Sequence, residues 1–165
     1  TSGANANKVI IPSGQTLEVA DGLRSADMPT GSVLQVVSTT SGTEQSTGST
    51  SFVATNLSAS ITPSSTSSKI LISYTTSIGS NTNGFTATTI YKGSTNLGQG
   101  SVGFAWGKDY DNRWAGPASG IYLDSPSTTS SVTYTVYFRT QESGHTSYVQ
   151  FSHARGAIVI MEIAG

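Results

Sequence analysis

The sequence predicts an all-β protein built from two packed antiparallel sheets. β-Branched and aromatic residues dominate its apolar clusters, whereas the residues that favour helices are sparse. Short segments of alternating apolar and polar residues follow one another closely, and Gly, Ser, Asn and Pro separate them. This arrangement is typical of a β-sandwich or a β-barrel.

Nine strands are expected in the main part of the chain. They cover residues 32–39, 50–55, 57–62, 69–76, 85–91, 119–123, 132–140, 147–152 and 157–164. In the segment 132–140, Val, Tyr, Val and Phe alternate with Thr, Thr, Tyr and Arg, which predicts one buried and one solvated face.

Residues 1–30 form a different unit in this interpretation. Val9, Ile11 and Leu17 lie in a short strand, turn and strand. Two strands cannot bury a core alone. We therefore expect segment 1–30 to pair with other copies or to continue an upstream shaft, before a hinge leads into a head of residues 31–165.

The last expected strand, 157–164, is apolar on nearly both faces. A simple sandwich buries only one face of a strand, so the second face is expected to meet another copy of the chain. A covering loop of the same chain is the alternative, and Glu162 could equally be exposed at the strand end. The candidate interface residues of a homo-oligomer are Val9, Ile11, Leu17, Ile158, Ile160 and Glu162. Three-fold symmetry suits a shaft that leads into a head, although the composition does not fix the number.

Composition excludes several classes of function. The 165 residues carry a net charge of −1, and 10% of them are charged. A basic stripe for nucleic-acid binding is absent, no apolar run reaches the ~18 residues of a membrane span, and no cysteine is present. Residues 1–8 also lack the apolar core of a signal peptide. We therefore expect neither a nucleic-acid partner nor membrane insertion.

No motif predicts a catalytic centre, a cofactor or a metal. The pattern Gly-x-Gly-x-x-Gly at 98–103 is not followed by a helix, so a turn is expected there rather than a phosphate site. A Gly-x-Ser-x-Gly nucleophile motif is missing, and His145 and His153 are expected to be ordinary surface residues. Asp109 and Asp111 could span the ~5–9.5 Å between glycosidase carboxyls. Their loop, however, shows no sign of a raised carboxyl pKa and does not complete a calcium-binding pattern.

The segment 104–114 is the most informative loop, because it combines both tryptophans with a cluster of charges. Aromatic rings beside Asp, Asn and Arg are typical of a recognition surface. The alternative places the aromatic residues in the core. Alternation puts Phe104 and Trp106 on one face and favours the core for these two, whereas Tyr110 is expected to be exposed. Two further polar loops, 79–84 and 141–146, could either form hydrogen bonds to a polar ligand or simply connect the strands of hairpins.

Several stretches together resemble the distal domain of bacteriophage tail fibres. They are residues 28–37, 51–63, 67–72, 122–126 and 133–136, and the terminal Ile-Met-Glu-Ile-Ala-Gly at 160–165 is the most specific of them. Residues 9–17 resemble the strand-turn repeat at the end of a fibre shaft.

The resemblance implies a homotrimeric fibre tip on the virion, with a jelly-roll-like β-sandwich in each subunit. It further implies attachment to a host cell-surface receptor, either a glycan or an outer-surface protein, without enzymatic activity. Segments 79–84, 104–117 and 141–146 depart from the framework. The candidate receptor contacts in them are Asn81, Asn83, Lys108, Asp109, Tyr110, Asp111, Asn112, Arg113, Trp114 and His145. A secreted lectin, a fibre-borne glycan depolymerase and a purely structural decoration protein are the alternatives.

Overall fold

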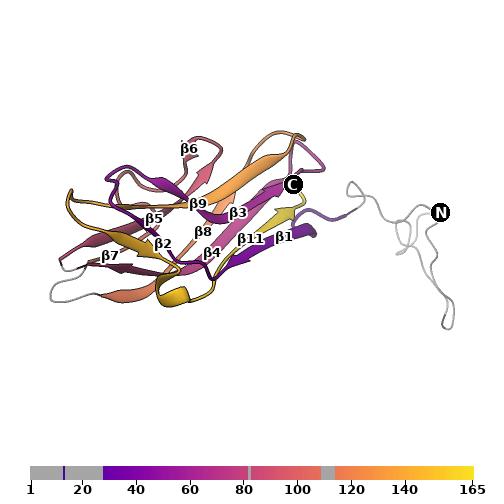
Figure 1. The fold of residues 1–165 in the computed structure, drawn as a ribbon. Helices are drawn as coiled ribbons and strands as arrows, with labels where there is room; N and C mark the ends of the chain where they lie inside the picture. Colours follow the sequence, from indigo (N-terminus) through magenta and orange to yellow (C-terminus); the bar gives the residue numbers. More distant parts are fainter. Residues whose placement is uncertain (1–12, 14–27, 82, 109–113) are drawn as a thin grey trace.

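The chain folds as a sandwich of two antiparallel β-sheets (Figure 1). The computed structural model describes residues 13, 28–81, 83–108 and 114–165. Among these residues the only helical element is a 3₁₀ turn, Phe151–His153. The prediction of an all-β, two-sheet protein is confirmed.

The first sheet has six strands and the second has five. The first contains β1 (Val33–Ser41), β2 (Gln45–Thr47), β4 (Lys69–Ser80), β8 (Ala115–Asp124), β10 (Ser147–Val149) and β11 (Gly156–Ile163). The second contains β3 (Val53–Ile61), β5 (Phe85–Lys92), β6 (Thr95–Asn96), β7 (Ala105–Lys108) and β9 (Val132–Thr140).

Strand β4 organises the first sheet. It pairs with β8 along one side, and with β11 and then β10 along the other. Strand β11 in turn pairs with β1. In the second sheet β9 lies between β3 and β5, while β5 also pairs with β6 and β7.

The core lies between the sheets and follows the alternation of each strand. Its larger cluster includes Leu57, Ile72, Val136 and Ile160, and a smaller cluster centres on Ile78 and Phe138. Strand β3 is a single strand, so the expected division into 50–55 and 57–62 is wrong. Its inward residues alternate without interruption from Val53 to Ile61, and only the pairing with β9 shifts, between Ala54 and Ser58.

Several polar groups inside the sandwich are paired, although the fully buried side-chain amide of Gln150 has no hydrogen-bond partner among the described residues. Asp124 accepts hydrogen bonds from Lys92 at 3.0 Å and from the Tyr134 hydroxyl at 2.7 Å. Burial, reinforced by this carboxylate, raises the pKa of Tyr134 well above its usual range. Burial also raises the pKa of Tyr74 to about 12, although the hydroxyl of Thr88 lies 2.8 Å away and lowers it in part.

The two ends of the sandwich differ. At one end, the base, β1 begins and β11 ends, and backbone hydrogen bonds of 2.8 Å join Gly31 to Ala164 and Ala164 to Ser32. At the other end, the loop end, four connections link β2 to β3, β4 to β5, β7 to β8 and β9 to β10. The chain between residues 28 and 31 therefore reaches the head at the end opposite these connections.

Candidate functional site

The connections at the loop end are held together by hydrogen bonds. The Asn81 backbone N–H donates to Thr146 O at 3.1 Å, and the Thr146 N–H donates to Asn81 Oδ1 at 2.8 Å. The Ser80 N–H donates to Trp114 O at 3.2 Å, next to the β7–β8 connection. Three predicted recognition segments, far apart in the sequence, thus converge at one end of the sandwich.

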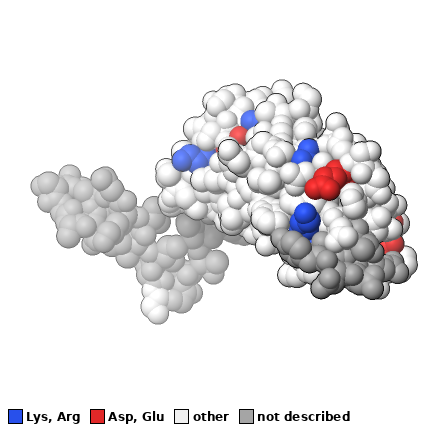
Figure 2. Space-filling view, turned by 90° about the vertical axis from the view of Figure 1, so that its left-hand side faces the viewer, with Lys and Arg blue, Asp and Glu red and all other residues white. Residues whose placement is uncertain are grey.

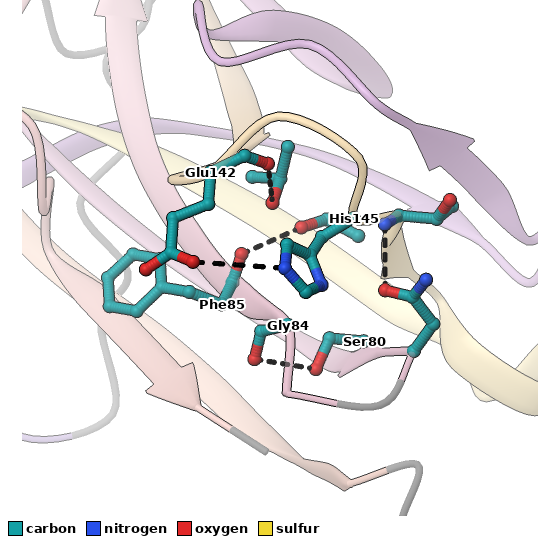
Figure 3. A network of polar contacts seen from close by, with 9 residues as sticks. Ser80, Gly84, Phe85, Glu142 and His145 are labelled. Carbon is teal, nitrogen blue, oxygen red and sulfur yellow. Dashed lines mark hydrogen bonds and ion pairs between the residues drawn. The ribbon is translucent and has the colours of Figure 1, made fainter. Parts of the chain in front are cut away.

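Polar contacts extend beneath these loops (Figure 3). The Ser80 hydroxyl donates to Gly84 O, and the Ser147 hydroxyl donates to Phe85 O. His145 Nε2 lies 3.8 Å from a carboxylate oxygen of Glu142, on the same loop. Asn83, by contrast, is exposed and has a φ of 59°, a left-handed conformation that Asn tolerates better than most residues.

The two tryptophans occupy opposite environments. Trp114 packs against the smaller core cluster, and its indole covers Gly107 and Gly116 so closely that a Cβ on Gly107 would lie 2.0 Å from the ring. Trp106, in contrast, is 56% exposed. The favoured placement of Trp106 in the core is therefore wrong, whereas Trp114, a candidate receptor contact, is partly buried against the core.

The reversal follows from local backbone geometry. Phe104 does pack against the core, as expected. It lies just outside strand β7, however, next to Gly103, which has a φ of 65°. Regular alternation starts only at Ala105, whose side chain faces inward, so that Trp106 projects from the outer face of the second sheet.

An aromatic surface covers part of this outer face. Trp106 stacks on Phe85 with ring centroids 5.2 Å apart, and Tyr91 stacks on Tyr137 at 4.0 Å. The Arg139 guanidinium lies 5.4 Å from the centre of the Phe52 ring. The sequence did not predict a surface role for Phe52, Phe85, Tyr91, Tyr137 and Arg139. For Tyr137 and Arg139, the signal was their outward alternation in strand 132–140.

The remaining receptor candidates divide into two groups. Lys108 ends β7 and pairs with Phe85, so it lies on the same outer face as Trp106. Asp109, Tyr110, Asp111, Asn112 and Arg113 lie outside the described residues. Figure 2 looks at the loop end and shows a surface that is mostly uncharged, with a few charged groups spread across it.

The interface candidates of the last strand lie inside the subunit. Ile158, Ile160 and Glu162 are each 0% exposed, because the second sheet of the same chain covers this face of β11. They are thus not accessible to another copy, and the possible exposure of Glu162 at the strand end is wrong. Val9, Ile11 and Leu17 lie outside the described residues.

Glu162 is the centre of a buried hydrogen-bond network. Its Oε1 accepts hydrogen bonds of 2.7 Å from the Ser64 N–H, the Ser64 hydroxyl and the Ser68 hydroxyl, and its Oε2 accepts one from Gln35. Burial alone would raise the pKa of this carboxyl, but the hydrogen bonds from Ser68, Gln35 and Ser64 outweigh it and lower the pKa. Glu162 therefore ties the β3–β4 connection and β1 to β11 at the base.

The opposite face of β11 carries an exposed apolar surface. The strand registers place Val36, Met161, Leu71 and Leu123 in one row across four strands, with Ser38, Val159, Ser73 and Ile121 in the next row. Val36, Ile121 and Leu123 are 56%, 64% and 50% exposed. We call these two rows the apolar face of the first sheet.

Neither known proteins nor metal or membrane features give a further indication of function. No protein-family model matches the chain, and no curated protein matches it. Within the described parts of the chain, no group of three or more His, Cys, Asp or Glu side chains is placed to hold a metal ion. No helix in those parts is long and apolar enough to span a membrane.

Proposed function

We propose that the chain is the receptor-binding head of a bacteriophage tail fibre, a homotrimer without enzymatic activity that attaches the virion to a host cell surface. The single observation that carries this proposal is the polarity of the head. Residues 28–31 reach it at the base, while the recognition segments converge at the loop end. A head at the tip of a fibre needs this arrangement, because its receptor approaches from the side away from the shaft.

The apolar face of the first sheet supports the homotrimer. It is long enough to cross four strands, and neither of its rows contains a charged residue. These two rows therefore bring no charged side chain to the contact, and Lys69 lies one row further towards the base. Exposed apolar surface of this kind usually marks an interaction site, and the other subunits of the trimer are the occupants that the fibre proposal supplies.

The trimer is tested by native mass measurement. The wild-type chain is expected at three times the 17.0 kDa mass of one copy. Ile121→Ser is expected to shift it towards the monomer, whereas Thr133→Val, on the outer face of the second sheet, is expected to leave the trimer intact. A wild-type mass of 17.0 kDa at micromolar concentration would refute the trimer.

The receptor role is tested by adsorption of the purified chain to bacterial cells. Asn83→Ala at the loop end is expected to weaken adsorption, and so are Tyr110→Ala and Arg113→Ala in the predicted recognition segment 104–117. Lys69→Ala, a matched loss of positive charge at the exposed base of β4, is expected to leave it unchanged. Equal losses in both groups, or no adsorption to any candidate host, would contradict the proposal.

Two other functions are distinguished by simple observations. A secreted lectin would be encoded behind a signal peptide rather than behind fibre-shaft repeats. A fibre-borne depolymerase would release new reducing ends from host polysaccharide and lose this activity in Asp111→Ala. The jelly-roll connectivity expected from the resemblance remains part of the proposal.

A further inference from the structure

The Trp106 side chain is positioned as a flat platform. Its indole stacks on Phe85 with an interplanar angle of 20° and a centroid separation of 5.2 Å. Phe85 is only 6% exposed, whereas Trp106 is 56% exposed. One face of the indole therefore covers the buried phenyl ring, and the other face is open to solvent.

The residues around this platform are small or polar. The registers place Trp106, Ala87 and Arg139 side by side on β7, β5 and β9. Ala87 is fully buried between these two large neighbours. Lys108 lies one position further along the same face, beside Phe85. The open indole thus has two cationic side chains beside it, of which Arg139 already donates a hydrogen bond of 2.7 Å to Thr50 O.

The size of the exposed apolar group decides between ligand classes. Among the described residues, Trp106 is the only large hydrophobic side chain of the second sheet that is strongly exposed. A specific protein–protein interface buries about 800 Å² on each partner around an apolar core, and one indole is too small to form such a core. A pyranose ring matches it better, because the ring presents an apolar C–H face to the indole while its equatorial hydroxyls point sideways towards donors.

We propose that Trp106 is the stacking platform of a saccharide-binding site on the outer face of the second sheet, next to Arg139 and Lys108. This inference rests on the proposed receptor-binding function and names its ligand: a pyranose unit of a cell-surface polysaccharide. It also extends the receptor site beyond the loops, onto a strand whose position is fixed by the sheet.

The test uses the full chain, polysaccharide extracted from a panel of bacterial surfaces, and the intact cells. Affinity electrophoresis in gels that contain the polysaccharide measures the binding of every variant in the same way. Trp106→Ala is expected to weaken saccharide binding about tenfold or more, equivalent to 1.4 kcal/mol or more. Trp106→Phe is expected to restore part of the affinity, and Lys69→Ala serves as the matched surface control. The emission of the partly buried Trp114 in the Trp106→Ala variant reports whether the fold is intact.

The outcomes separate this inference from the function on which it rests. If Trp106→Ala binds polysaccharide as tightly as the wild type, the platform is refuted while receptor binding stands. If the wild type adsorbs to cells but not to their polysaccharide, the saccharide ligand is refuted. If the wild type binds polysaccharide through Trp106 but adsorbs to no cell, the platform stands and the attachment function fails. Absence of both kinds of binding refutes both.

Discussion

Replacing Glu162 by glutamine would remove the negative charge that four hydrogen-bond donors surround at the base of the sandwich. Glutamine keeps the size of the side chain, so the core around it does not need to repack. A hydrogen bond to a charged group contributes about 1 kcal/mol more than one between neutral groups. The amide NH₂ would also face at least one of the present donors, and a buried donor left without an acceptor costs about 1–3 kcal/mol.

The destabilisation is partly offset, because a neutral amide costs less to bury than a carboxylate. We expect Glu162→Gln to lower the free energy of unfolding by about 2–4 kcal/mol, equivalent to a fall of roughly 4–16 °C in the melting temperature. The pH dependence has a defined sign. The lowered pKa of Glu162 contributes stability above the unfolded-state value of about 4.3, and this contribution is lost as the pH falls through the folded-state pKa.

Urea unfolding followed by tryptophan fluorescence measures this effect at pH 7 and again near pH 3. The difference between wild type and variant should shrink at the lower pH. Glu142→Gln, at a largely exposed carboxylate, is the matched control, with an expected change below about 0.5 kcal/mol. An unchanged stability of Glu162→Gln would refute the network. A loss that depends on protein concentration would refute the assignment of Glu162 to the inside of one subunit.

Two further predictions concern buried aromatic residues. Gly107→Ala places a methyl group 2.0 Å from the Trp114 ring. We expect the free energy of unfolding to fall by about 1–3 kcal/mol and the Trp114 emission to change. Gly48→Ala, where the added Cβ would lie at an ordinary contact distance of 3.5 Å from His145 O, should change little. The raised pKa values of Tyr74 and Tyr134 contribute stability that is complete below pH 10 and is lost as the pH rises towards the folded-state values. Between pH 10 and 11 we expect the free energy of unfolding to fall by about 1 kcal/mol for each tyrosine. Tyr74→Phe should make this fall smaller, and an unchanged alkaline slope in the variant would contradict the assignment.

The strands that sequence predicted best are those in which alternation alone sets the burial. Strand β9 has its predicted bounds, 132–140, because its apolar and polar residues alternate without interruption. Strand β8 was expected only from 119, but it begins at Ala115 and contains Pro117. Within the described residues β8 pairs with β4 alone, and an edge strand tolerates a proline that a central strand would not. Three of the four shortest strands, β2, β6 and β7, were missed because two to four residues carry too little periodicity.

The candidate site was harder to predict, since the partner of each face is set by tertiary structure. Both faces of β11 are apolar in the sequence, and the pattern could not say which one the second sheet covers. The covered face packs against residues that are distant in the sequence, such as Leu57 and Val136 in the second sheet, and Gln35 reaches Glu162 from β1. The exposure of Trp106 and the packing of Trp114 depend likewise on the backbone at Gly103 and on the space above Gly107. The sequence predicted that segments 79–84 and 141–146 share a recognition role, but it did not predict that they contact each other.

The two exposed apolar features lie on opposite outer faces of the sandwich, and this separation has a consequence for binding. Copies that meet through the apolar face of the first sheet leave the Trp106 platform of the second sheet uncovered. A trimer built in this way would present three platforms at once, and linked weak sites can exceed the affinity of one site by about 10²–10⁴-fold. Ile121→Ser should therefore weaken adsorption to cells far more than it weakens binding of a short, monovalent saccharide. Equal effects on the two measurements would mean that the apolar face and the platform are not separate functional surfaces.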